Sequence, residues 1–132
     1  MTILRLPPAL AAQIEREARE AAPRECCGLI EGAHIDGVFT AAAIYPVRNV
    51  AEAADRFEID PADHFRALHA ARANGRQIIG CYHSHPGGKA EPSEADRAGA
   101  AEEGFLWLIA GADGLRLYVF KTGAFEAGEV SA

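Results

Sequence analysis

The sequence predicts an α+β fold, a mixed sheet flanked by helices, and three observations lead to this prediction. First, the 132 residues are 49% hydrophobic and 24% charged, which is an ordinary globular composition. Second, segments with helical periodicity alternate with short apolar runs of strand length. Third, turn-type residues join some of these runs in pairs, which indicates hairpins within the sheet. The length is that of one domain, so we expect a single domain over residues 1–132.

The first predicted helix follows Pro8. Leu10, Ile14 and Ala18 recur at every fourth position and form one apolar stripe along a helix. Pro23 ends this helix, because the residue before a proline disfavours helical backbone.

A short apolar run over residues 25–31 comes next, and it is consistent with a strand covered on both faces. Asp36 and Gly37 supply turn chemistry between this run and a second run over residues 38–45. We expect the two runs to form a hairpin with a loose turn. Residues 46–56 are expected to be a loop.

A second helix has clear signals at both ends. Asp60 is a suitable N-cap, Pro61 fits the first turn, and Gly75 ends the helix. We expect Phe65 and Leu68 to belong to the buried stripe of this helix. The later elements are a buried strand over 77–83, a third helix from Ser93 to Gly104, and a hairpin of strands 105–110 and 115–120 around the turn at 112–114.

Charge and cysteine content exclude several classes of protein. With 13 basic and 19 acidic residues the net charge is −6, which disfavours nucleic acid as the main partner. No apolar window reaches the length of a membrane span, and the N-terminus has no signal-peptide pattern. Cys26, Cys27 and Cys81 are odd in number and two are adjacent, so we expect reduced thiols and a cytoplasmic protein.

The residues that indicate chemistry lie in one segment of the chain, residues 83–96. His83 and His85 are two apart, so on an extended backbone they point to one side, about 6.5–7 Å apart, and Pro86 favours that backbone. Asp96 is a suitable third ligand, because the chain has room to return it over the strand end. Two imidazoles and one carboxylate with an open position is the pattern of a catalytic zinc site. Ser93-x-x-Asp96 also reads as a helix capping box, and the two interpretations are compatible.

These residues resemble a known motif. His83-Ser84-His85-Pro86 followed by Ser93-x-x-Asp96 is similar to the signature of the JAMM metalloproteases, the JAB/MPN superfamily. The likeness extends to the run from Pro23 to Gly32, and it continues through residues 57–61 and 79–82. The chain most resembles the small prokaryotic members, so the resemblance implies an MPN/JAB1-like fold.

Carried over by position, the resemblance implies zinc held by His83, His85 and Asp96, with a water in the fourth position. Glu25 would be the general base that activates this water and later protonates the leaving amine. Ser93 would donate a hydrogen bond to the oxyanion. Glu31 and Glu58 lie in the same segments and are rivals for the role of Glu25. The Gly87-Gly88-Lys89 segment is expected to be a mobile loop with no further role.

The resemblance implies a zinc isopeptidase or peptidase that cuts after the C-terminal Gly-Gly tail of a ubiquitin-like protein, in bacteria a sulfur carrier of the ThiS or MoaD type. Two alternatives stay open: a RadC-like protein associated with DNA repair, and a catalytically silent MPN scaffold. The sequence lacks the His-Glu-x-x-His of thermolysin-like enzymes and the Pro-Cys-x-x-Cys of zinc deaminases. A thiol hydrolase that uses Cys81 beside His83 is a fourth interpretation.

Overall fold

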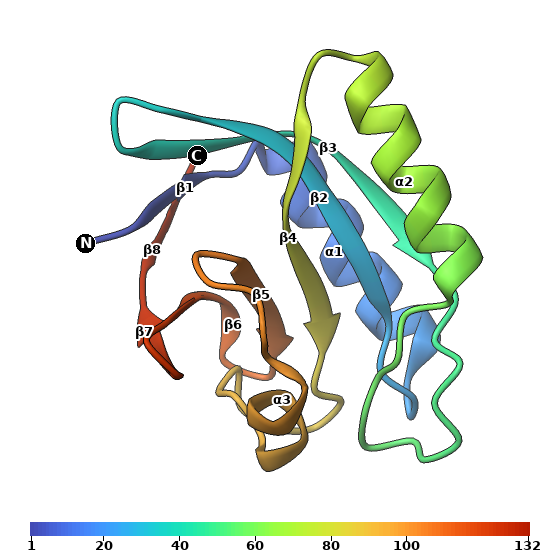
Figure 1. Ribbon diagram of the computed structural model, residues 1–132. Helices are drawn as coiled ribbons and strands as arrows, with labels where there is room; N and C mark the ends of the chain where they lie inside the picture. Colours follow the sequence, from blue (N-terminus) through green and yellow to red (C-terminus); the bar gives the residue numbers. More distant parts are fainter.

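The computed structural model describes residues 1–132 and contains one eight-stranded mixed sheet with three helices (Figure 1). In chain order the elements are β1 (Ile3–Arg5), α1 (Pro8–Ala21), β2 (Cys27–Ile35), β3 (Val38–Val47), α2 (Pro61–Ala73), β4 (Gln77–Ser84), α3 (Glu94–Gly99), β5 (Leu106–Gly111), β6 (Gly114–Lys121), β7 (Ala124–Ala127) and β8 (Glu129–Ser131). The strand order is β7-β6-β5-β4-β2-β3-β1-β8. The predicted α+β class with a mixed sheet is confirmed.

The sheet is mixed because three of its seven strand pairs are parallel. β1 runs parallel to both β3 and β8, and β4 runs parallel to β5, whereas the other neighbours are antiparallel. The outermost strands β7 and β8 are consecutive in the chain, and at their junction the Gly128 amide donates to the Leu117 carbonyl of β6 while the Glu129 amide donates to the Thr2 carbonyl beside β1. The sheet therefore curls back on itself, and β8 follows β7 directly (Figure 1).

The two long helices cover opposite faces of the sheet. The larger core cluster contains Ile14 of α1 together with Ile30 and Tyr82. The smaller cluster contains Ala67 of α2 together with Leu29 and Cys81. Because neighbouring residues of a strand point to opposite faces, this alternation along β2 and β4 places α1 and α2 on different sides.

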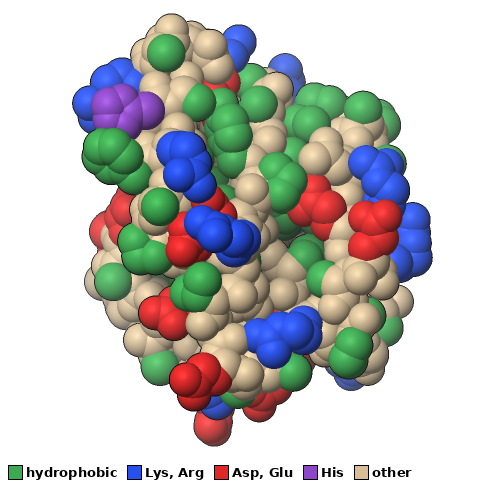
Figure 2. All heavy atoms as spheres, turned by 90° about the vertical axis from the view of Figure 1, so that its right-hand side faces the viewer, with side chains coloured by type: hydrophobic (Ala, Val, Ile, Leu, Met, Phe, Trp, Pro, Cys, Tyr) green, Lys and Arg blue, Asp and Glu red, His purple; other side chains and the backbone are tan.

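The side of α2 that faces the sheet differs from the predicted one. Phe65 and Leu68 are 62% and 42% exposed, whereas the buried residues of the helix are Ala67 and Ala71. The prediction that Phe65 and Leu68 are buried was therefore wrong, because a face of small alanines lets the helix approach the sheet closely. Figure 2, seen from the side of α2, shows hydrophobic side chains between basic ones on this surface.

Several predicted boundaries also change. The turn between β2 and β3 is tight, since Asp36 and Gly37 both have positive φ (52° and 78°), as two-residue hairpin turns with the twist of the strands require. α3 ends at Gly99 rather than at Gly104. The short strands β1, β7 and β8 were not predicted. None of the three helices combines the length and the apolar character that a membrane-spanning helix requires.

Candidate metal centre

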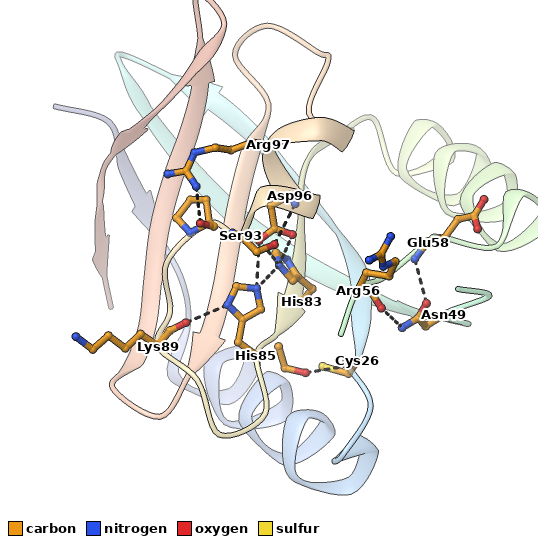
Figure 3. A network of polar contacts seen from close by, with 12 residues as sticks. Cys26, Asn49, Arg56, Glu58, His83, His85, Lys89, Ser93, Asp96 and Arg97 are labelled. Atoms are coloured by element: carbon orange, nitrogen blue, oxygen red, sulfur yellow. Dashed lines mark hydrogen bonds and ion pairs between the residues drawn. The ribbon is translucent and has the colours of Figure 1, made fainter. Parts of the chain in front are cut away.

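The two histidines of the motif lie at the end of the central strand β4. His83 is fully buried, and it lies opposite Cys27 of β2 and Ile109 of β5. His85 follows the last residue of the strand, and its amide donates to the carbonyl of Ala110 at 2.9 Å. The two rings converge, because their Nε2 atoms are 3.1 Å apart (Figure 3).

Asp96 reaches the same point from the first turn of α3. Its Oδ2 atom lies 3.1 Å from His83 Nε2 and 3.2 Å from His85 Nε2. Ser93 caps this helix: its Oγ accepts from the Asp96 amide at 3.1 Å, while its own amide donates to Asp96 Oδ2 at 2.9 Å. The predicted capping box is therefore present, and it holds the Asp96 carboxylate in the direction of the two imidazoles.

In its neutral form, His85 has its lone pair on Nε2, the atom that faces His83 and Asp96. Its Nδ1 lies 2.9 Å from the carbonyl oxygen of Lys89, and since a carbonyl can only accept, Nδ1 carries the proton. Burial lowers the pKa of His83, although Asp96 opposes this effect, so His83 favours the neutral form that binds metals. Nδ1 of His83 has no hydrogen-bond partner, so its Nε2 makes the polar contacts of this ring.

Three potential ligand atoms therefore form a nearly equilateral triangle with edges of 3.1, 3.1 and 3.2 Å. A tetrahedral ion with ligand bonds of about 2.0–2.2 Å spaces its ligand atoms roughly 3.3–3.6 Å apart. Hydrogen bonds alone do not account for all three edges, because each Nε2 atom carries at most one hydrogen and three edges would need three. Two imidazole nitrogens and one carboxylate oxygen are also a ligand set that zinc accepts. The residues present fit a zinc ion.

Glu25 is the second carboxylate at this point. It lies two residues before β2 rather than at the start of the strand, and it is only 5% exposed. Glu25, His83 and His85 each offer a ligand-type atom within 4.8 Å of the other two. Burial raises the pKa of Glu25 to about 7, against the opposing effect of His85, and its Oε1 atom has no hydrogen-bond partner. Glu25 is thus close to the triangle and has the pKa that suits a proton shuttle near neutral pH.

A cavity of about 340 Å³ opens onto these groups from solvent. It is lined by Glu25, His85 and Ser93 together with Asp55, Lys89 and Glu91. The base, one imidazole and the capping serine therefore border one accessible space. A second hollow of about 380 Å³ lies beside Asp96 and has more apolar walls, which include Phe57 and Trp107.

The segment that follows His85 is bonded on both sides, in contrast to the mobile loop that we expected. Besides the Lys89 carbonyl that fixes His85, the Ala90 amide donates to Asp113 Oδ1 at 2.7 Å, and the Tyr118 hydroxyl donates to the Ala90 carbonyl at 2.7 Å. Asp113 and Tyr118 were missed as contributors to the site. The turn signal around Asp113 was visible in the sequence, but its bond to residue 90 was not.

An aromatic wall was missed as well. The ring of Phe57 stacks on the ring of His83, with centroids 4.3 Å apart and planes inclined by 26°. The edge of Trp107 approaches the same imidazole, with centroids 5.8 Å apart. These contacts hold the His83 ring from two sides and help to bury it.

The rivals for the catalytic roles lie elsewhere. Glu31 is fully buried and accepts hydrogen bonds from Tyr45, Asn74 and Arg76, so its carboxylate is already occupied. Glu58 is exposed, and Figure 3 shows its side chain pointing away from the histidines. Burial raises the pKa of Cys81 well above its ordinary value, so this thiol is not suited to be a nucleophile.

Comparison with known proteins identifies the family. The family described as "Prokaryotic homologs of the JAB domain" matches residues 7–121. The chain belongs to this family. The resemblance to the JAB/MPN superfamily that the motifs indicated is thereby confirmed.

Two curated relatives have names that describe an activity. The chain is 39% identical over 121 residues to a protein of Haloferax volcanii named "Desampylase", with 86% of each chain covered. It is 30% identical over 122 residues to a "Probable TtuB-protein conjugate cleaving protease" of Thermus thermophilus, which covers 92% of this chain and 78% of the relative.

Among solved structures, a JAB1/MPN domain protein of Archaeoglobus fulgidus has the same fold. It superimposes with a TM-score of 0.61 at 21% identity, and each chain is covered completely. This likeness confirms the predicted MPN/JAB1-like fold.

Proposed function

We propose that this JAB-family protein is a zinc-dependent isopeptidase or peptidase that cuts the bond after the C-terminal Gly-Gly tail of a ubiquitin-like protein. The observation that carries the proposal is the triangle of His83, His85 and Asp96 with Glu25 beside it at the border of an open cavity. The names of the two curated relatives support the substrate class, since both describe cleavage of protein conjugates or modifiers.

In this proposal His83, His85 and Asp96 would hold the ion. When bound, a zinc ion lowers the pKa of a coordinated water to about 7 and polarises a carbonyl. Glu25 takes a proton from the attacking water and returns it to the leaving amine, a role that suits a buried carboxyl with a pKa of about 7. The hydroxyl of Ser93 accepts from the Asp96 amide and keeps its own proton available for the oxyanion of the intermediate.

A sulfur carrier of the ThiS or MoaD type, which ends in a glycine tail, is our proposal for a bacterial substrate. Three free cysteines agree with a reducing, cytoplasmic compartment. A silent scaffold is disfavoured because all five candidate site residues are present, and a RadC-like role in DNA repair is disfavoured by the net charge of −6.

The test is cleavage of a ubiquitin-like carrier extended past its Gly-Gly tail, with zinc and with a chelator. Glu25→Gln should lower kcat by roughly 10²–10⁴-fold while it keeps the zinc, because only the proton shuttle is lost. Glu58→Gln is the matched control and should retain activity, since this side chain is exposed and points away. Zinc-loaded wild type that leaves the carrier intact, or an active Glu25→Gln variant, would refute the proposal.

A further inference from the structure

Asn49 uses all the hydrogen-bonding capacity of its side-chain amide. Its Nδ2 donates to the carbonyl of Glu25 at 3.0 Å and to the carbonyl of Arg56 at 3.1 Å. Its Oδ1 accepts from the amides of Ala51 and Glu58, both at 3.0 Å. Figure 3 shows Asn49 with its bonds to Arg56 and Glu58. One side chain therefore joins two segments that are far apart in the sequence.

The first of these segments carries the candidate base. Glu25 precedes β2, so no ladder bond of this strand holds it, and its Oε1 atom has no partner. The next residue, Cys26, is tied to the end of β4, since its amide donates to Ser84 Oγ and its carbonyl accepts from the Ser84 amide. The carbonyl of this same peptide group, which belongs to Glu25, accepts the hydrogen bond from Asn49 Nδ2.

The second segment is the loop between β3 and α2. Asn49 pairs with Ile59 in an isolated antiparallel bridge, and the Val50 amide donates to the Glu58 carbonyl at 2.9 Å. This closure brings Phe57 onto the ring of His83, with centroids 4.3 Å apart. The loop therefore supplies one wall of the metal centre.

We propose that Asn49 is a positioning residue that sets Glu25 and Phe57 in register with His83. The proposal rests on the proposed function for the part that concerns catalysis. A carboxylate that moves a proton must be held within a fraction of an ångström of its position, and a displacement of about 1 Å costs roughly 10²-fold in rate. Asn49 provides this constraint for Glu25, and through the loop it places the aromatic wall against the imidazole.

Asn49→Asp separates the positioning role from a merely structural one. The aspartate keeps an oxygen that accepts from Ala51 and Glu58, and the backbone bond from Val50 to Glu58 still closes the loop. It has no donor for the carbonyls of Glu25 and Arg56. We expect zinc content to stay unchanged and kcat to fall about 10–100-fold, with a smaller change in KM. A folded, zinc-loaded Asn49→Asp variant with the kcat of the wild type would overturn the proposal for Glu25.

Asn49→Ala and Asn74→Ala form a matched pair, because these are the two asparagines of the chain. Asn74 donates to Glu31, away from the metal centre, so its loss should lower the melting temperature and leave kcat unchanged. Asn49→Ala should lower kcat as well. Equal kcat in the two alanine variants would count against Asn49.

A fluorescence readout makes the test independent of activity. Trp107 is the sole tryptophan, is nearly buried, and packs against Phe57 with ring centroids 5.8 Å apart. Asn49→Ala should release Phe57 and increase quenching of Trp107 by acrylamide, whereas Asn74→Ala should not. If zinc-loaded wild type cleaves no carrier, the proposed function fails. Equal quenching of Trp107 in Asn49→Ala and Asn74→Ala would overturn the proposal for Asn49, whatever the outcome of the cleavage assay.

Discussion

Glu31→Gln removes the charge of a fully buried carboxylate that has three hydrogen-bond donors around it. Tyr45, Asn74 and Arg76 donate to this group, and Arg76 Nη1 lies 2.8 Å from Oε2. Burial raises the pKa of Glu31, but the bonds from Tyr45, Arg76 and Asn74 outweigh burial and hold the pKa below its ordinary value of 4.5. The ionised form is therefore the one that stabilises the fold.

The magnitude follows from these contacts. A hydrogen bond to a charged group contributes about 1.5–3 kcal/mol. Arg76 is 45% exposed, so water screens its share, and Tyr45 and Asn74 provide most of the stabilisation. Glutamine keeps one acceptor oxygen, so we expect a loss of about 2–3 kcal/mol in the free energy of unfolding. For a chain of this length, that corresponds to a fall of roughly 10 °C in melting temperature.

The pH dependence has a definite sign. Because the folded pKa of Glu31 is depressed, its contribution is complete above the unfolded value of 4.5 and is lost as the pH falls through the folded value. The gap in melting temperature between wild type and Glu31→Gln should be largest at neutral pH and should shrink below about pH 4.5. Circular dichroism melts between pH 3 and 7 measure this gap, and Glu20→Gln on an exposed turn of α1 serves as the control.

Two results would refute this reasoning. A gap of the same size at pH 3 and pH 7 would show that the charge of Glu31 is not the stabilising feature. Loss of cleavage activity in folded Glu31→Gln would make Glu31 a candidate base again, in conflict with its place roughly 20 Å along the strand from Glu25.

Three further predictions concern the ligand set, the cap and the core. Asp96→Ala should lose most of the bound zinc by elemental analysis, and full retention would remove Asp96 from the ligand set. Ser93→Ala should cost about 1 kcal/mol as a lost cap and lower kcat about 10²–10³-fold; wild-type kcat in the folded, zinc-loaded variant would leave Ser93 as a cap alone. Gly28→Ala would place its Cβ 2.2 Å from the ring of Tyr82, so the melting temperature should drop sharply, whereas Gly99→Ala, with nothing within 4 Å, should not change it.

The residues that the sequence could predict lie close together in the chain. His83, His85, Ser93 and Asp96 fall within one short segment, and strand alternation with a helix cap is enough to bring them together. Glu25 is far from them in sequence, and only the family resemblance pointed to it. The structure brings it to the histidines through the pairing of β2 with β4.

The contacts that could not be predicted depend on tertiary structure. Asn49 has an ordinary loop setting in the sequence, and its partners at Glu25 and Glu58 become neighbours only when the loop closes. Phe65 and Leu68 fit a buried stripe by periodicity, but the helix packs on its alanines instead. Periodicity reports that a helix is amphipathic, and close packing against a sheet can favour the smaller side chains.

The pairing of β1 with β8 has a consequence for how the protein is made. Ile3 to Arg5 lie beside Glu129 to Ser131, so β1 pairs with residues that are synthesised long after it. β1 can pair with β3 early, but its second edge stays open until β8 has left the exit tunnel. Contacts between distant parts of a chain also form slowly, because a large loop must close first. Until β8 emerges, the nascent chain therefore exposes one unpaired strand edge, which a chaperone or a neighbouring nascent chain could bind.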